Sequence, residues 1–358
     1  MQSPAHRDVA QQINQRSQMQ FIPILRAFGL LCLAPALALG QAASTLHPEK
    51  VIGNTKCADC HEQELKAWKL SGHARSDSVH RDAKTRATAD KIAKAMGLKS
   101  GAAMTTSALC TECHFTRQKV GGSLRVIGGV SCESCHGGGK DYHSIHGETE
   151  KIPDRDERRK RSKALGMLYP HDTHLVAQNC FNCHIIRDEK LVNVGGHPAR
   201  SKGFNLASWT AGEVRHNFYD KDFKRNAETN LDTDTNRKRK MLVVGMLLDL
   251  QYSLANLARG KTPGGAYRKA MGNRAYGIIN KELPLVIEKL GDEVPKELLE
   301  IQTIVKAVKL SGKQSLVAEA AASLEGPITA FSKAQDGSAL AGVDSLIPKT
   351  AKGQAWQP

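Results

Sequence analysis

The chain has 358 residues, and its 51 Lys and Arg against 36 Asp and Glu give a formal net charge of +15 at pH 7. This length allows one large domain or two ordinary ones. The basic balance favours an acidic protein partner or an anionic membrane surface. Nucleic-acid binding is disfavoured, because only 5% of the residues are aromatic and the N-terminus predicts export.

The N-terminal segment is predicted to be a secretory signal peptide. An apolar stretch at residues 27–39 follows an arginine and runs into a small-x-small pattern that ends at Gly40. We therefore expect residues 1–40 to be removed. Pro35 interrupts the apolar stretch, which is too short to span a bilayer as a helix, so we expect no transmembrane span in the mature chain. Met19 is an alternative start, because the residues before it are unusually polar for a signal.

Eight of the nine cysteines fall in four Cys-x-x-Cys-His motifs, at residues 57–61, 110–114, 132–136 and 180–184. Two thiols at this spacing can bond both vinyl positions of one porphyrin edge, and the histidine that follows can ligate the iron from one face. Zinc sites or a disulfide framework would not explain a histidine after every second cysteine. The sequence therefore predicts four covalently bound haem c groups. Their attachment residues are Cys57, Cys60, Cys110, Cys113, Cys132, Cys135, Cys180 and Cys183, with proximal ligands His61, His114, His136 and His184.

The residues after the first motif predict a helix that ends before the next histidine. Residues 62–70 carry apolar side chains at helical spacing, and Gly72 and His73 follow. His73 comes twelve residues after His61, which is about 18 Å along a helix. Because that distance is too large for both rings to bind one iron, we expect His73 to serve a different haem.

The middle of the chain predicts two exposed helical segments and one hairpin. Residues 78–99 indicate a charged helix closed by Gly97, and residues 120–130 indicate a short hairpin with glycine turns. Residues 154–163 form a strongly charged run. It is interpreted as a solvated helix face or linker, with a haem-propionate clamp or a docking patch as the alternative.

The C-terminal third is predicted to be helical and free of haem. Residues 241–257 indicate a long buried helix, and Asp249 within it argues against a membrane span. No Cys or His occurs after His216. We expect a helical domain at residues 226–335 and a flexible tail at residues 336–358. Further helical patterns occur at residues 264–282, 294–310 and 313–335.

The haem region resembles the tetrahaem cytochrome c-554 family known from nitrifying bacteria. The resemblance rests on the first motif with Trp68-x-x-Ser71-x-His73, and on Gly-Val-Ser-Cys-Glu-Ser-Cys-His-Gly at residues 129–137 with a histidine ten residues past the haem histidine. It covers roughly residues 53–218, and the family's usual proline is replaced by Gly138. It implies a fold wrapped around packed haem pairs, with distal histidines from remote segments, and it permits one haem without a distal ligand.

The candidates for distal ligands are the eight histidines outside the motifs from His73 to His216. The resemblance favours His73, His146 and His216, with His143 as the rival of His146. His174 and His197 compete for the fourth iron, and an open sixth position is the remaining alternative. Ligation by two histidines suits electron transfer, whereas an open position permits small-molecule binding or catalysis.

Together these patterns predict a mainly α fold. A tetrahaem cytochrome c domain with little regular structure would occupy residues 41–225, followed by the helical domain. We favour an exported periplasmic electron carrier with an acidic redox partner over an enzyme. The alternative is a multihaem reductase acting on a small nitrogen oxide at a five-coordinate haem. A third hypothesis is a non-catalytic subunit that assembles, as a homo-oligomer or a larger complex, through the C-terminal helices.

Overall fold

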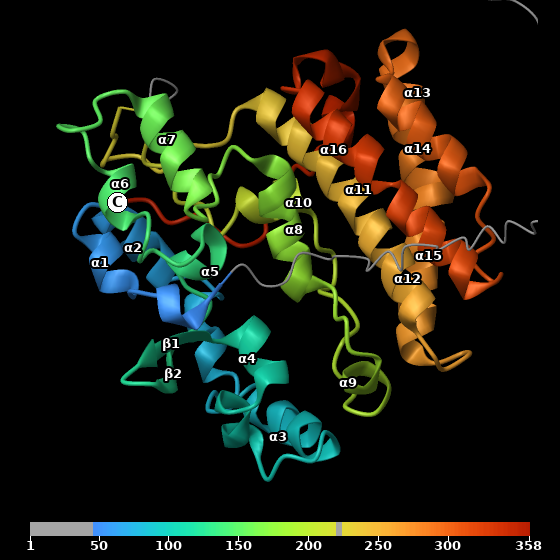
Figure 1. Ribbon diagram of the computed structural model, residues 1–358. Coiled ribbons are helices and arrows are strands. Elements are labelled where there is room, and N and C mark those ends of the chain that lie inside the picture. Colours follow the sequence, from blue (N-terminus) through green and yellow to red (C-terminus); the bar gives the residue numbers. More distant parts are fainter. Residues whose placement is uncertain (1–45, 220–223) are drawn as a thin grey trace, which may run out of the picture. The chain divides into compact units, whose positions relative to one another are not determined.

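The computed structural model describes residues 46–219 and 224–358, which belong to one compact unit (Figure 1). The predicted signal peptide at residues 1–40 and the alternative start at Met19 lie outside the described residues. The fold is mainly helical, as predicted, and the described residues contain a single two-stranded sheet.

Short helices dominate the first half of the chain. In order they are η1 (Pro48–Lys50), α1 (Asn54–Ala58), α2 (Glu62–Lys69), η2 (Ala74–Ser78), α3 (Arg86–Ala95), η3 (Gly101–Thr105), α4 (Ala108–His114), α5 (Cys132–His136), α6 (His143–His146), α7 (Arg155–Ala164), α8 (Thr173–His184), α9 (Glu189–Asn193) and α10 (Leu206–Thr210). Three motif histidines are the last residues of helices, and His61 precedes α2 directly. Three motifs therefore end a helix, and the first connects α1 to α2.

The hairpin prediction is confirmed, and the exposed-helix prediction is wrong at its start. Strands β1 (Thr116–Val120) and β2 (Ser123–Gly128) pair antiparallel around a Gly-Gly turn. The helix predicted over residues 78–99 begins only at Arg86. Before it, Asp82 Oδ1 accepts a hydrogen bond from Lys84 N (2.8 Å) and Thr85 Oγ1 donates to Val79 O (2.7 Å). These side chains satisfy the backbone in a turn instead of a helix.

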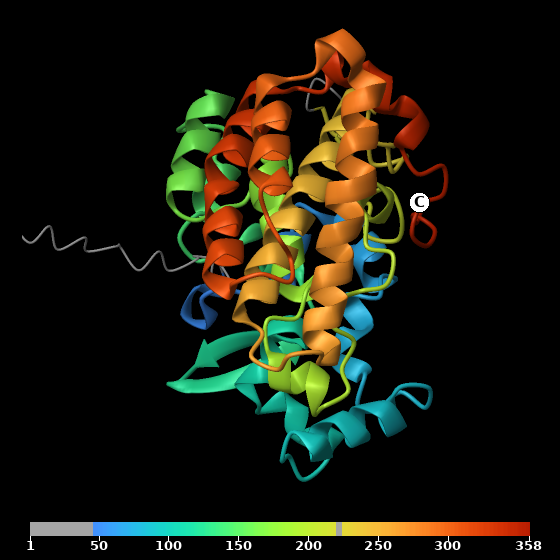
Figure 2. The same ribbon diagram turned by 90° about the vertical axis from the view of Figure 1, so that its right-hand side faces the viewer.

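The C-terminal helices surround one long, buried helix. The elements are α11 (Thr235–Arg259), α12 (Ala266–Gly277), the π-helical turn η4 (Ile278–Glu282), α13 (Leu283–Leu290), η5 (Gly291–Glu293), α14 (Lys296–Lys306), α15 (Gln314–Ser323), α16 (Glu325–Ala334) and η6 (Ser338–Leu346). Helix α11 packs against α12, α15 and α16, and also against α8 and α10 (Figure 2). Of the described helices, α11 alone is long and apolar enough to cross a membrane, and 89% of that window is buried inside the protein. This burial is that of a core helix.

One apolar core joins these helices to the segment that carries the fourth motif. The core extends over residues 177–343 and includes Phe181 and Leu206 as well as the apolar face of α11. The close approach of α10 and α11 requires Gly245, because a Cβ there would lie 2.9 Å from Leu206 Cβ. The buried core thus continues across residue 226, where the sequence suggested a boundary.

The segment expected to be a flexible tail is packed. Leu340 and Val343 of η6 are fully buried. Beyond η6, Lys352 N donates to Ser208 O and Lys352 O accepts from Glu213 N, both at 2.9 Å. The contacts beyond η6 are made by backbone groups, which leave no pattern of apolar side chains from which to predict them.

Candidate functional site

Each of the four motif histidines faces a second histidine from a remote segment. The ring centres of the pairs are 6.1–6.3 Å apart: His61 with His146 (6.2 Å), His184 with His73 (6.1 Å), His114 with His197 (6.3 Å) and His136 with His216 (6.1 Å). The pairs join parts of the chain that are far apart in sequence.

This separation suits an iron held between two imidazoles. A metal–nitrogen bond of about 2 Å on each side, plus roughly 1 Å from each nitrogen to its ring centre, gives about 6 Å between centres. The angles between the ring planes are 14°, 51°, 71° and 87° in the four pairs, so no common stacking geometry explains the constant distance. The residues present therefore fit a haem iron in each pair.

In six of the eight rings, a hydrogen bond holds Nδ1, the nitrogen that would not bind the iron. A ring nitrogen that meets a carbonyl oxygen must carry the proton, which leaves Nε2 free to bind a metal. The Nδ1 partners are Leu168 O for His136 (3.0 Å), His143 O for His146 (2.8 Å), Pro198 O for His197 (2.8 Å), Val214 O for His216 (2.7 Å), Ser201 Oγ for His184 (2.7 Å) and Glu64 Oε1 for His61 (3.2 Å).

Burial keeps several of these rings neutral. It lowers the pKa of His114, His136 and His184 to about 4, and the positive charge that the facing histidine can carry adds to this shift. Burial also lowers the pKa of His73 and His146. Because the neutral imidazole is the form that binds a metal, these rings need lose no proton on ligation near pH 7.

The cysteines bring the motifs together in two groups. The thiols of Cys57 and Cys132 lie close enough to interact, as do those of Cys113 and Cys183. The helices that carry these motifs are also in contact, α1 with α5 and α4 with α8. The first motif therefore adjoins the third, and the second adjoins the fourth.

Glu133, inside the third motif, fixes the start of the first. Its carboxylate is 1% exposed and accepts hydrogen bonds from the backbone N–H groups of Ile52 (2.9 Å), Gly53 (2.8 Å) and Gly139 (2.7 Å). A buried carboxylate with three donors is well satisfied. The sequence did not predict this role. The one feature that could have indicated it is a charged residue between the two cysteines of a motif.

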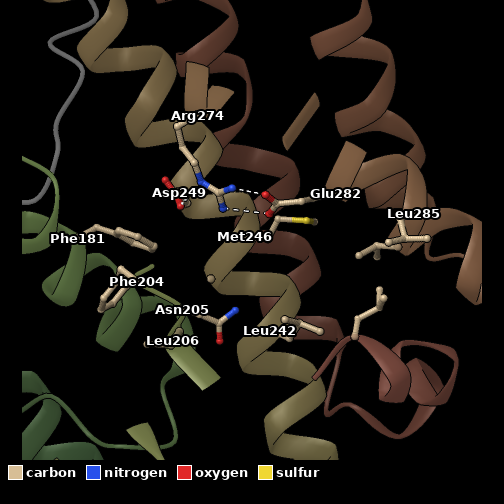
Figure 3. A pocket seen from close by; sticks show the side chains of 13 residues that line it. Phe181, Phe204, Asn205, Leu206, Leu242, Met246, Asp249, Arg274, Glu282 and Leu285 are labelled. Carbon is tan, nitrogen blue, oxygen red and sulfur yellow. Dashed lines mark hydrogen bonds and ion pairs between the residues drawn. The ribbon is translucent and has the colours of Figure 1, made fainter. Parts of the chain in front are cut away.

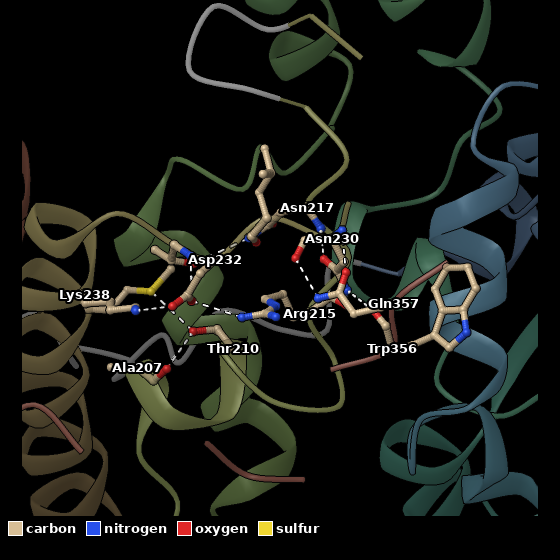
Figure 4. A network of polar contacts seen from close by, with 12 residues as sticks. Ala207, Thr210, Arg215, Asn217, Asn230, Asp232, Lys238, Trp356 and Gln357 are labelled. Atoms are coloured by element: carbon tan, nitrogen blue, oxygen red, sulfur yellow. Dashed lines mark hydrogen bonds and ion pairs between the residues drawn. The ribbon is translucent and has the colours of Figure 1, made fainter. Parts of the chain in front are cut away.

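A buried amide holds the segment around His216 (Figure 4). Asn230 is 1% exposed; its Oδ1 accepts from Asn217 N, and its Nδ2 donates to the carbonyls of Arg215 and Trp356, all at 2.8 Å. The residues on both sides of His216 are thus tied to one another and to the C-terminal segment.

A cavity of about 250 Å³ lies beside the fourth motif, and its polar wall is a buried ion network (Figure 3). Asp249, 2% exposed, accepts two hydrogen bonds from Arg200 (3.0 and 2.6 Å) and one from Arg274 Nε (2.7 Å). Arg274 also pairs with Glu282. Ser201, next to Arg200, contacts His184, so the contact of Arg200 with α11 supports the histidine of the fourth motif.

Two sequence candidates lie outside the pairs. His174 Nε2 lies 3.8 Å from Glu325 Oε1, and His174 faces no motif histidine. Of the two histidines that competed for the fourth iron, only His197 faces a motif histidine, which is His114. His143 Nε2 contacts Lys56 O (3.1 Å) and supports His146 through its own carbonyl. Within residues 46–219 and 224–358, no group of three or more His, Cys, Asp or Glu could hold a metal ion by itself.

Comparison with known proteins supports the resemblance. Residues 56–137 match the family model described as cytochrome c554 and c-prime. Cytochrome c-554 of Nitrosomonas europaea is 27% identical over 174 residues, which are 45% of this chain and 68% of that protein. No solved structure matches. The predicted resemblance to cytochrome c-554 is confirmed, and it supports covalently bound haem c and electron transport.

Proposed function

We propose that this chain, which resembles cytochrome c-554 over its first motifs, is an exported tetrahaem c-type cytochrome that relays electrons between redox partners in the periplasm. Haem c, when bound, supplies an iron that accepts and returns one electron. The observation that carries the proposal is the repeated pair, in which each motif histidine faces a second histidine across 6.1–6.3 Å.

Ligation by two histidines favours a carrier over an enzyme. With both axial positions filled by rings on fixed backbone, little structure changes when the iron is reduced, and no position is left for a substrate. His197 opposite His114 matters most, because the resemblance permits one haem without a distal ligand. The alternative, reduction of a nitrogen oxide at a five-coordinate haem, requires one of these pairs to open.

The grouping of the motifs supports transfer within the chain. The first and third motifs adjoin through their cysteines, as do the second and fourth, and α5 contacts α8 between the two groups. Covalent attachment at these positions brings porphyrin edges close together. An electron that enters at any one motif therefore has a continuous route to the other three.

We propose an acidic partner because the chain as a whole is basic and α7 is rich in basic residues. This helix lies against α6, which carries His146, and Ser162 is its one buried residue (Figure 1). It carries six basic side chains, Arg155, Arg158, Arg159, Lys160, Arg161 and Lys163. A basic helix beside a haem would steer an acidic protein to it, and the association rate would then fall steeply with ionic strength.

Intact mass and a reductive titration test the relay proposal. The processed chain should exceed its polypeptide mass by four haem groups, and stepwise anaerobic reduction should consume four electrons per chain. Three or fewer haems, with a metal ion in the remaining motif, would contradict the proposal. A matched pair of acidic and basic redox proteins used as electron donors should differ in rate, with the acidic one faster.

A further inference from the structure

His61 differs from the other motif histidines in the hydrogen-bond partner of its Nδ1. Glu64 lies on α2, three residues after His61, and its side chain is 12% exposed. Its Oε1 lies 3.2 Å from His61 Nδ1. The other five ring nitrogens described above meet a neutral oxygen, four of them a backbone carbonyl and one the hydroxyl of Ser201.

The same carboxylate is shared with an arginine from a distant segment. Arg225 Nη1 lies 3.4 Å from Glu64 Oε1, and Nη2 lies 3.3 Å from Oε2. The guanidinium also lies 5.6 Å from the ring centre of Tyr219 and donates to its hydroxyl (3.3 Å). Arg225 therefore lies against Glu64 and offsets part of its charge.

A carboxylate acts on an axial histidine more strongly than a carbonyl does. It pulls the Nδ1 proton and makes the imidazole a stronger electron donor. A stronger donor stabilises ferric iron more than ferrous iron, which lowers the reduction potential. A neutral oxygen in the same place has a smaller effect.

We infer that Glu64 is a positioning residue that orients His61 and lowers the reduction potential of the haem bound at residues 57–61. The inference rests on the proposed haem ligation. This haem is then hard to reduce and ready to give up its electron. Its second histidine, His146, lies on α6 beside the basic helix α7, so the donating haem would adjoin the surface proposed for an acidic acceptor.

The test is a potentiometric titration of the holoprotein, followed by the visible α-band of the haems. In Glu64→Gln, one of the four components should move to higher potential while the other three stay in place. Arg225→Gln should move the same component to lower potential, because the carboxylate then keeps its full charge. Glu62→Gln is the matched control, because Glu62 lies on the same helix and pairs with Lys66 (2.8 Å). This substitution removes the same charge without changing a contact to a histidine.

The inference is overturned if Glu64→Gln shifts no component by more than the control does, or shifts all four alike. Intact mass of each variant separates this outcome from failure of the relay proposal, which predicts four haems in every one. If Glu64→Gln does not acquire its haems, the titration of Arg225→Gln is the deciding test. A fall in one component supports the inference, and an unchanged titration contradicts it.

Discussion

Two regions of this protein reach a stable fold by different means. The haem-motif region, residues 46–170, carries the first three motifs on short helices, and its one apolar cluster consists of Ala89, Ala93, Met104 and Phe115. The helical bundle, residues 235–346, surrounds a 25-residue helix. The twelve largest fully buried side chains among the described residues all lie between Phe181 and Phe331.

The difference supports the proposal that porphyrins supply the core that the haem-motif region lacks. A segment of more than a hundred residues with so little apolar burial cannot offset the conformational entropy lost on folding. The bundle has no such deficit. Helix α8, which carries the fourth motif, lies between the two, because Phe181 packs into the core of the bundle while Cys183 contacts the second motif.

The largest expected effect comes from withholding haem. In a chain produced without haem attachment, residues 46–170 should exchange backbone hydrogens almost freely, whereas α11 to α16 should stay protected, because their core contains no porphyrin. Hydrogen-exchange mass spectrometry of the apo and holo chains measures both regions at once. Equal protection of the two regions in the apo chain would show that the haem-motif region has a sufficient core of its own.

The second effect concerns the ion network that joins the bundle to the fourth motif. Asp249→Ala leaves Arg200 without its carboxylate and should lower the free energy of unfolding by about 3–5 kcal/mol. Asp344→Ala is the control, since it removes a similar pair with Arg239 on the surface and should change little. Urea unfolding of both variants measures the two losses in free energy of unfolding. Equal losses would mean that the buried network contributes no more than the surface pair.

A smaller effect is expected inside the bundle. Leu254→Ala removes a fully buried side chain of α11 and should cost about 3 kcal/mol, while the haem spectrum stays unchanged. Leu316→Ala, at a side chain that is 57% exposed, should stay within about 0.5 kcal/mol of the parent. Thermal unfolding followed separately by helix and haem signals tests this. A haem spectrum altered by Leu254→Ala would mean that the bundle core sets haem ligation.

The smallest effect on stability should come from the distal ring of one pair. His197→Ala should leave the fold intact but make one reduced haem bind carbon monoxide, because His114 then has no partner ring. His174→Ala should bind none, since His174 faces no motif histidine. Carbon monoxide binding by both variants, or by neither, would remove His197 from the set of ligands.

Local patterns were enough to predict much of the fold. The Cys-x-x-Cys-His spacing identified the four motif histidines, the Gly-Gly turn identified the hairpin, and the apolar run at residues 241–257 identified α11. Each of these depends on residues close together in the chain. The same reasoning failed at residues 78–85, where Asp82 and Thr85 close a turn through their side chains.

The pairing of the histidines could not be derived in this way. His61 and His146 are far apart in sequence, and nothing local distinguishes His197 from His174. What distinguishes them is tertiary: the turn that carries His197 is held by a hydrogen bond from its backbone N–H to Leu191 O (3.1 Å). Glu64 and Asn230 escaped notice for the same reason, because their partners lie on other segments.

The most direct test of the relay proposal is ligand binding by the unmodified holoprotein. All four ferric haems should give low-spin electron paramagnetic resonance signals, and the fully reduced protein should bind no stoichiometric carbon monoxide or nitric oxide, because the proposed ligation places each iron between two histidines. A high-spin ferric signal from one haem, with rapid binding at that haem and turnover of a nitrogen oxide, would contradict the relay and establish a reductase.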